Sequence, residues 1–235
     1  MITIRSAMFN DLDGIMDVER ETFGEVGDGA MASRELMADR IQLLNANSTW
    51  FWVAEHEGKI VGDMILQPTR MTPDECTSWA HATDDGTLKK TFDEAGKTIY
   101  GVSLAVSSRA PEGTSELLIH RLLQSWLDTG KDCFMICSRM PGFKEAHEQT
   151  AIAAEDYWQQ RRLSDGKPVD WMLRLFQDMI GVSPQRLLIN GFPVDEDSGG
   201  HGVLCVSTDP IPTMKALSAW LDSRGISCGL DFKDV

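Results

Sequence analysis

One segment constrains the fold more than any other part of the chain: residues 98–127, TIYGVSLAVSSRAPEGTSELLIHRLLQSWL. Its first part is rich in apolar and β-branched residues and predicts a central strand. After a short loop, apolar residues recur at helical spacing beyond Gly113, at Leu117, Leu118, Leu122 and Trp126. A helix N-terminus presents unpaired N–H groups and a partial positive charge, so the turn at Gly113 is a candidate phosphate site.

The rest of the chain alternates between predicted strands and helices. The predicted strands lie at 2–7, in a hairpin over 49–71, at 132–138, near 187–192 and at 201–207. The predicted helices lie at 9–25, 33–47, 144–162 and 171–181. Residues 72–98 are polar and turn-rich, which is typical of a functional lid or an elaborated loop. Because the late strands form a hairpin, we predict a mixed α/β sheet.

Composition limits the classes of function. The chain has 235 residues, of which 42% are hydrophobic and 25% charged, and we expect one domain. Its formal net charge of −14 argues against a nucleic-acid partner, because phosphates require a basic face. No apolar stretch approaches the ~20 residues of a membrane-spanning helix, and the N-terminus lacks a signal-peptide pattern. We therefore expect a cytoplasmic protein with no membrane partner.

The sequence contains no motif that indicates metal binding or hydrolase catalysis. His147 lies in HEQ, which lacks the second histidine of a zincin helix, so we expect no metal site. Ser107, Ser108 and Ser115 lack the G-x-S-x-G elbow of a hydrolase nucleophile. The five cysteines are odd in number and lack paired zinc spacing, which favours reduced thiols over a disulfide framework.

The order of elements, together with the strand, turn and helix at 99–127, resembles the GNAT superfamily of acyl-CoA N-acetyltransferases. This resemblance implies an α/β GNAT fold, a mixed, mostly antiparallel sheet with splayed central strands flanked by helices. It implies that pantetheine enters between the splayed strands and that the following loop wraps the pyrophosphate of coenzyme A. The implied contacts are Leu104, Ala105, Val106, Arg109, Gly113, Thr114 and Ser115. The loop departs from the family pattern, because Arg109 lies one position early and Glu112 adds a negative charge.

Four longer stretches resemble, more specifically, the GNAT-like loading domains of curacin- and saxitoxin-type polyketide synthases. They are TSWAHATDDGTLKKTFDEAGKTIYGVSLAV, ICSRMPGF, WMLRLFQDMIGV and GFPVDEDSGGHGVLCVS. The resemblance implies decarboxylation of a malonyl-type thioester in polyketide chain initiation, and it leaves open whether acyl transfer accompanies it. The acyl group would be carried by coenzyme A or by the phosphopantetheine of an acyl carrier protein. We expect a GNAT-like domain over 1–211, with 212–235 as a C-terminal helix or linker.

The same resemblance implies a catalytic histidine and threonine with an arginine nearby. His147 is the candidate donor and proton source, because imidazole titrates near neutral pH. Thr114 is the candidate hydroxyl, and Arg162 is the candidate to receive a carboxylate or phosphate with its forked donors. Alternatives to these positions are Thr87, Thr98, Arg161, Arg174 and, in reserve, His201. Ordinary structural roles compete with each assignment, among them a surface histidine and a helix-capping threonine.

Two other functions stay open at this point. One is a conventional acetyl-CoA-dependent N-acetyltransferase, which would need a general base and an amine site. The other, from a different class, is a non-catalytic pantetheine-binding module. Loss of carbon dioxide from a malonyl carrier without added amine would favour decarboxylation over both.

Overall fold

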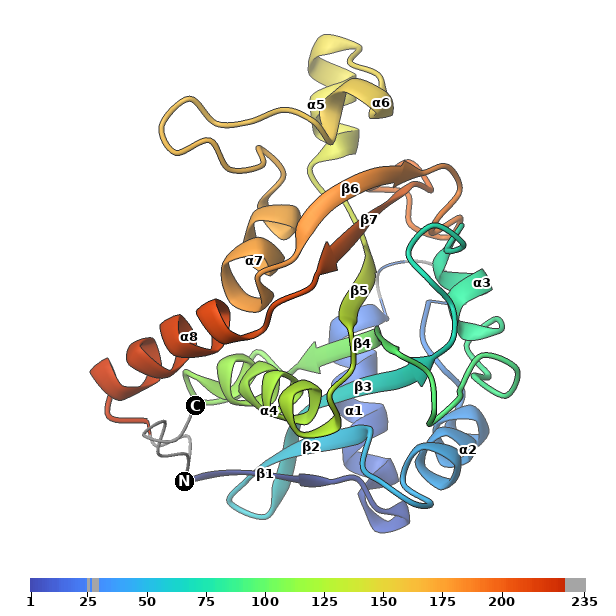
Figure 1. The fold of residues 1–235 in the computed structure, drawn as a ribbon, viewed down its shortest axis with the longest axis vertical. Helices are drawn as coiled ribbons and strands as arrows, with labels where there is room; N and C mark the ends of the chain where they lie inside the picture. The colour runs from blue at the N-terminus through green and yellow to red at the C-terminus, as the bar shows by residue number, and fades with distance from the viewer. Residues whose placement is uncertain (25, 27–29, 227–235) are drawn as a thin grey trace.

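The computed structural model describes residues 1–24, 26 and 30–226 of the chain. Its centre is a seven-stranded sheet in the order β1-β2-β3-β4-β5-β7-β6 (Figure 1). The strands are β1 (Ile2–Ser6), β2 (Phe51–His56), β3 (Lys59–Thr69), β4 (Thr98–Val106), β5 (Cys133–Ser138), β6 (Ser183–Leu188) and β7 (Gly202–Ser207). Neighbouring strands are antiparallel except β4 and β5, which are parallel. The predicted mixed, mostly antiparallel α/β sheet is confirmed.

Helices cover both faces of this sheet. They are α1 (Leu12–Phe23), after a short 3-10 turn η1 (Phe9–Asp11), α2 (Arg34–Leu44), α3 (Trp79–Thr83), α4 (Thr114–Thr129), α5 (Phe143–Thr150), α6 (Ala154–Tyr157), α7 (Trp171–Ile180) and α8 (Ile211–Ser223). In Figure 1, α4 lies in front of the sheet and α1 behind it. The last helix, α8, packs against α4 and α7. The boundary predicted between 211 and 212 stays a prediction, and residues 227–235 lie outside the described residues.

Three predicted elements differ in detail from the structure. The helix predicted over 144–162 is wrong, because Ala151 has a φ of 54° and ends α5, and only the short α6 follows. The strand predicted near 187–192 ends at Leu188 and begins earlier, at Ser183. The polar segment 72–98 contains the one-turn helix α3, in which the His81 N–H donates to the Ser78 hydroxyl at the helix N-terminus.

The central strands β4 and β5 pair only at their beginning. Their register joins Thr98, Ile99 and Tyr100 to residues of β5, and beyond Tyr100 the strands diverge (Figure 1). Gly101 lies at this point, and a Cβ there would come within 2.6 Å of Ile136 Cγ2. The absence of a side chain at this position therefore lets the side chains of β5 approach β4 where the pairing stops. The splayed central strands that the family resemblance implies are confirmed.

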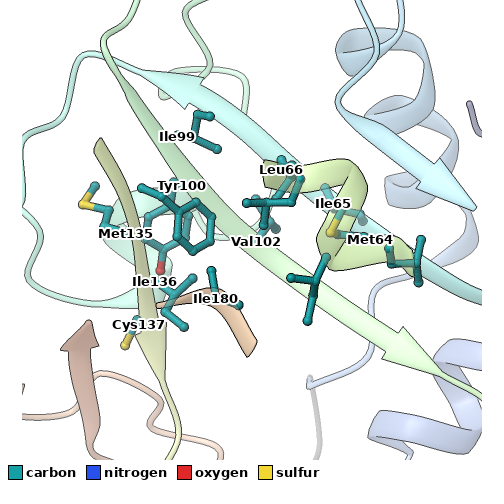
Figure 2. Close-up of a cluster of buried hydrophobic side chains, with 14 of the residues drawn as sticks. Met64, Ile65, Leu66, Ile99, Tyr100, Val102, Met135, Ile136, Cys137 and Ile180 are labelled. Atoms are coloured by element: carbon teal, nitrogen blue, oxygen red, sulfur yellow. The ribbon is translucent and has the colours of Figure 1, made fainter. Parts of the chain in front are cut away.

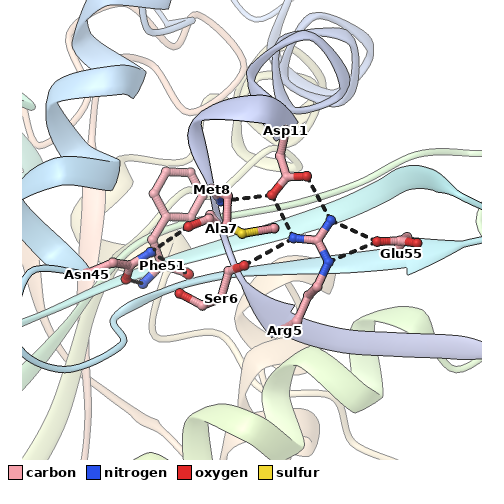
Figure 3. Close-up of polar contacts among 8 residues, drawn as sticks. All are labelled: Arg5, Ser6, Ala7, Met8, Asp11, Asn45, Phe51 and Glu55. Carbon is pink, nitrogen blue, oxygen red and sulfur yellow. Dashed lines mark hydrogen bonds and ion pairs between the residues drawn. The ribbon is translucent and has the colours of Figure 1, made fainter.

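Polar contacts fix the connection between β1 and α1 (Figure 3). The Arg5 guanidinium donates to both carboxylate oxygens of Asp11 at 2.7 Å, and its Nε donates to Glu55 on β2 at 2.8 Å. The Asn45 amide at the end of α2 donates to the Ala7 carbonyl. These bonds tie α1 and α2 to the sheet edge, and so they position the helices that border the site.

Candidate functional site

A cavity of 550 Å³ runs between the diverging strands β4 and β5. This size is ordinary for a small-molecule site. Four consecutive residues of β4 line it, together with three of β5: Gly101, Val102, Ser103, Leu104, Phe134, Ile136 and Cys137. Figure 2 shows that Val102, Ile136, Cys137 and Ile180 of α7 gather at this junction. The lining is predominantly apolar, and the hydroxyl of Ser103 is buried there with no hydrogen-bond partner among the residues that the structure describes.

The walls of the cavity come from both sides of the sheet. Ile119 and Leu122 of α4 line it from one face, and Glu19 of α1 lines it from the other. The indole of Trp79 on α3 also borders the cavity, and its Nε1 donates to the Val102 carbonyl at 2.9 Å. The segment predicted as a lid or elaborated loop therefore contributes a wall and satisfies one carbonyl of the splayed strand.

Three buried charged side chains meet at the face of the sheet covered by α1 and α2. Glu19 is 2% exposed, Arg40 is 3% exposed, and Asp63 on β3 is fully buried. Glu19 and Arg40 line the cavity, whereas Asp63 is not among its lining residues. Within the described residues, Glu19 Oε1 and both Asp63 carboxyl oxygens have no hydrogen-bond partner. Arg40 donates to the Gly86 carbonyl at 2.8 Å, and no described carboxylate forms an ion pair with it.

Burial raises the pKa of both carboxyls in this cluster. Loss of water raises the pKa of Glu19 to about 7, and the nearby Arg40 cation lowers it in part. The pKa of the Asp63 carboxyl is raised well above its ordinary value, first by burial and then by the Glu19 charge. Glu19 is therefore the carboxyl of this cluster that titrates near neutral pH. We refer to Glu19, Arg40 and Asp63 as the inner cluster.

A second buried pair borders the cavity from the segment before α5 and the loop before β7. Arg139 Nε and Nη2 each donate to a carboxylate oxygen of Asp195 at 2.7 Å. The Ser198 hydroxyl also donates to Asp195, and it accepts from the Met140 N–H at 2.8 Å. These bonds lower the pKa of the Asp195 carboxyl against the opposing effect of burial. Every charge in this pair has a partner, and we refer to it as the bonded pair.

The loop between β4 and α4 already holds a carboxylate of the chain. Glu21 at the end of α1 accepts from the Ser107 hydroxyl and from the Ser108 N–H, both at 2.8 Å, and from the Ser108 hydroxyl. Arg109 Nη2 approaches the same carboxylate at 3.4 Å. These donors, chiefly the Ser108 hydroxyl, lower the pKa of Glu21 to about 2. Arg109 was predicted to contact coenzyme A. In the structure it contacts the Glu21 carboxylate, which occupies the donors of this loop.

The turn at Gly113 lies under the end of the described chain. Gly113 has a φ of 89° and precedes α4 directly, and a Cβ there would come within 2.5 Å of Ile226 Cδ1. Glu112 forms an ion pair with Arg224, which follows α8. The Thr114 hydroxyl donates to the Pro111 carbonyl at 2.7 Å, so it closes the turn. The cation at this turn therefore comes from Arg224, which the sequence pattern did not single out.

The predicted catalytic residues do not come together in the structure. His147 is exposed on α5, where its Nδ1 lies 2.8 Å from the Ile152 carbonyl, and it does not line the cavity. Arg162 is exposed and pairs with Asp165, and Thr114 is buried in its turn. Of the predicted cofactor contacts, Leu104 lines the cavity. The catalytic roles stay predictions, and these placements do not favour them.

The alternative positions are also apart from the cavity. His201 lies beside Phe143, Arg174 donates to the carbonyls of Pro168 and Val169, and Arg161 donates to the Trp158 carbonyl. The lining residues that the sequence patterns missed are Glu19, Arg40, Trp79, Arg139 and Asp195. A signal for two of them exists in the sequence. Glu19 and Arg40 occupy positions in the apolar stripes of their helices, where a charge is costly unless it has a role.

Neither a metal site nor a membrane-spanning helix is found in the described part of the chain. Within residues 1–24, 26 and 30–226, no group of three or more His, Cys, Asp or Glu side chains could hold a metal ion. Over the same residues, no helix has both the length and the apolar character needed to cross a membrane.

Comparison with known proteins identifies the architecture. No protein-family model matches the sequence, and no curated protein matches it either. Among solved structures, the loading GNATL domain of CurA from Lyngbya majuscula matches with a TM-score of 0.74 and 18% identity, covering 88% of this chain and 98% of that one. The chain has the GNAT fold.

Two further solved structures match this chain with lower TM-scores. The GphF GNAT-like decarboxylase in complex with isobutyryl-CoA matches with a TM-score of 0.70 and 22% identity, covering 88% of this chain and 98% of that one. The ribosomal-protein-S18-alanine N-acetyltransferase from Escherichia coli matches with a TM-score of 0.51 and 12% identity, covering 88% and 92%. At these identities the likeness establishes the GNAT fold, and the chemistry has to be argued from the residues of the cavity.

Proposed function

We propose that the protein binds an acyl thioester through its pantetheine arm and decarboxylates a malonyl-type acyl group in polyketide chain initiation. The acyl group is carried by coenzyme A or by an acyl carrier protein. The observation that carries this proposal is the divergence of β4 and β5 after Tyr100, with a 550 Å³ cavity between them. An extended arm with amide groups fits an opening where a strand edge has lost its partner strand. The buried Ser103 hydroxyl offers such an arm one further hydrogen bond.

The positions of the anion-binding loop, Ser107–Arg109, and of Arg40 support one orientation of the pantetheine arm, with its phosphate end at the loop and its acyl end at Arg40. The loop at Ser107–Arg109 already binds an anionic carboxylate, which suits it to the phosphate end. The inner cluster lies on the opposite face of the sheet from α4, and its Arg40 guanidinium has no carboxylate partner among the described residues. In this proposal Arg40 takes the role first predicted for Arg162 and receives the carboxylate of the acyl group.

The structural likeness supports the reaction class. The solved structure of GphF is that of a GNAT-like decarboxylase and contains isobutyryl-CoA, and the CurA structure is that of a loading domain. An apolar cavity also suits decarboxylation, because a carboxylate removed from water is destabilised relative to neutral carbon dioxide. The acyl carrier protein enters the proposal as the partner that presents the arm in a loading reaction.

The direct test incubates the protein with malonyl-CoA, and separately with a malonyl-loaded carrier protein, and weighs the thioester by mass spectrometry. The proposal predicts that the acyl group loses the mass of carbon dioxide without added amine. Leu104→Trp, which fills the cavity, is expected to abolish the loss, and Leu104→Ala, which leaves it open, is expected to retain it. An intact malonyl group with wild-type protein would contradict the proposal. Acyl transfer only when an amine is added would point to an N-acetyltransferase instead.

A further inference from the structure

Glu19 is a buried acid that no step described above uses. It lies on the stripe of α1 that faces the sheet, one turn after Ile15, and its side chain borders the cavity with 2% exposure. Its Oε1 has no hydrogen-bond partner within the described residues. A buried, unbonded carboxyl is costly to a fold, and groups of this kind concentrate at functional sites.

The groups that face Glu19 come from two other elements. Arg40 of α2 is the cation beside it, and Asp63 of β3 is the second carboxyl. Both carboxyls resist ionisation because they are buried. Only Glu19 of the two carboxyls borders the cavity. The arrangement leaves one carboxyl that holds its proton up to neutral pH and faces the space where an acyl group would lie.

We propose that the Glu19 carboxyl is the acid that protonates the acyl carbon after carbon dioxide leaves, with Asp63 as a positioning residue and Arg40, the group proposed to bind the substrate carboxylate, beside it. This inference rests on the proposed function. It assigns the proton-transfer role first predicted for His147 to a residue on a different helix. General acid catalysis by a positioned side chain is typically worth 10²- to 10⁴-fold in rate.

Decarboxylation and protonation require only the malonyl group, the Glu19 carboxyl and water. The bond between the α-carbon and the carboxylate of the malonyl group breaks, and its electron pair stays on the α-carbon as a thioester enolate. Carbon dioxide leaves the cavity. The α-carbon then forms a bond to the proton of the Glu19 carboxyl, and the electron pair of that O–H bond stays on Glu19 as a carboxylate. Water returns a proton to Glu19 before the next turnover.

The first measurement is the rate of carbon dioxide release from malonyl-CoA by wild-type protein and by Glu19→Gln, over a range of pH. The wild-type rate should fall as pH rises above about 7, because the acid form of Glu19 is needed. Glu19→Gln should lower the rate by roughly 10²- to 10⁴-fold and remove this pH dependence. Asp17→Asn, on the exposed side of the same helix, is the matched control and should behave as wild type.

A second measurement follows the same proton transfer in reverse. Exchange of the α-protons of acetyl-CoA in D₂O requires an acid–base group but no carboxylate on the substrate. Wild-type protein should catalyse this exchange, and Glu19→Gln should not. Arg40→Met removes the cation that lowers the pKa of Glu19, so the pH dependence of exchange should move to higher pH.

The outcomes separate this inference from the proposed function. Wild-type protein that releases no carbon dioxide would overturn the proposed function itself. Wild-type release with an equally fast Glu19→Gln would overturn the role of Glu19 and leave the proposed function standing. If Glu19→Gln does not fold, Glu19→Asp, which keeps a carboxyl, takes its place. It should retain partial exchange of the acetyl-CoA α-protons with a pH dependence, and adding Arg40→Met should move that pH dependence; an unmoved pH dependence would overturn the assignment.

Discussion

The cavity is bordered by two buried groups of charged side chains that differ in how completely they are bonded. In the bonded pair, Asp195 accepts two hydrogen bonds from Arg139 and one from Ser198. In the inner cluster, Asp63 has no hydrogen-bond partner within the described residues, and Arg40 is held by a backbone carbonyl rather than by a carboxylate. The inner cluster is buried and the bonded pair is largely buried, and both border the same apolar cavity.

The difference separates a structural role from a chemical one. A buried ion pair in which each charge has a partner holds two loops in place and leaves no unpaired charge to bind a ligand. A buried carboxyl without a hydrogen-bond partner, beside a cation that forms no close ion pair, lowers stability unless a substrate uses it. We therefore expect variants of the bonded pair to affect folding, and variants of the inner cluster to affect chemistry and the pH dependence of stability.

The largest expected effect on stability comes from breaking the bonded pair. Asp195→Ala leaves the Arg139 guanidinium buried without a counter-ion, and it should lower the free energy of unfolding by about 3 kcal/mol, the low end of the usual range. The low end applies because the Arg139 side chain is 20% exposed. Urea denaturation measures this loss. The double variant Arg139→Met with Asp195→Leu should recover most of it, and a single-variant loss below ~1 kcal/mol would contradict the structural role.

The inner cluster should give stability the opposite pH dependence. The pKa of Glu19 is about 7 in the folded state against 4.5 as its ordinary value, so the folded state holds the proton longer than the unfolded chain. Stability should therefore fall as pH rises from 4.5 to 7, by on the order of 3 kcal/mol. The lowered pKa of Asp195 acts in the other direction, and its contribution is lost as pH falls below 3.8.

Glu19→Gln isolates the first of these two dependences. Urea unfolding of wild type and variant across this pH range should give a difference in unfolding free energy that changes with pH, because only the wild type has the Glu19 proton. Parallel curves would show that Glu19 titrates alike in the folded and unfolded states. That result would remove the contrast between the two buried groups.

The smallest expected effect concerns the loop that holds Glu21. Glu21→Gln removes the internal negative charge from the donors of Ser107 and Ser108, so the phosphates of coenzyme A should bind roughly two- to five-fold more tightly. Isothermal titration calorimetry at low salt measures the gain, and added salt should reduce it. Glu35→Gln, exposed on α2, is the matched control. Weaker binding by Glu21→Gln would mean that Glu21 shapes the loop rather than competes for it.

Local patterns in the sequence were enough to predict most of the fold. The alternation at 2–7, the turn in the 49–71 hairpin and the helical spacing after Gly113 each depend on neighbouring residues, and each predicted element is present. The helix predicted over 144–162 ends at Ala151, which has a left-handed backbone conformation. Alanine normally favours a helix, so the sequence gives no sign of this break. The early start of β6 at Ser183 was missed because a proline follows it, which usually argues against a strand.

The site was harder to predict because its parts are distant in the sequence. The splayed strands and Leu104 follow from one local segment and its family resemblance. The inner cluster joins α1, α2 and β3 by tertiary packing, and no spacing rule connects Glu19 to Arg40. A usable signal was present, since each charge interrupts an apolar pattern. Asp63 interrupts one too, within the apolar strand KIVGDMILQPT.

The central claim is that a thioester arm passes between β4 and β5 with its acyl end at the inner cluster. A crystal structure with a non-hydrolysable malonyl-CoA analogue tests it most directly. The account predicts that the arm lies between Gly101–Leu104 and Ile136–Cys137, with the terminal carboxylate next to Arg40 and Glu19. An analogue bound elsewhere, with β4 and β5 unchanged around an empty cavity, would contradict it.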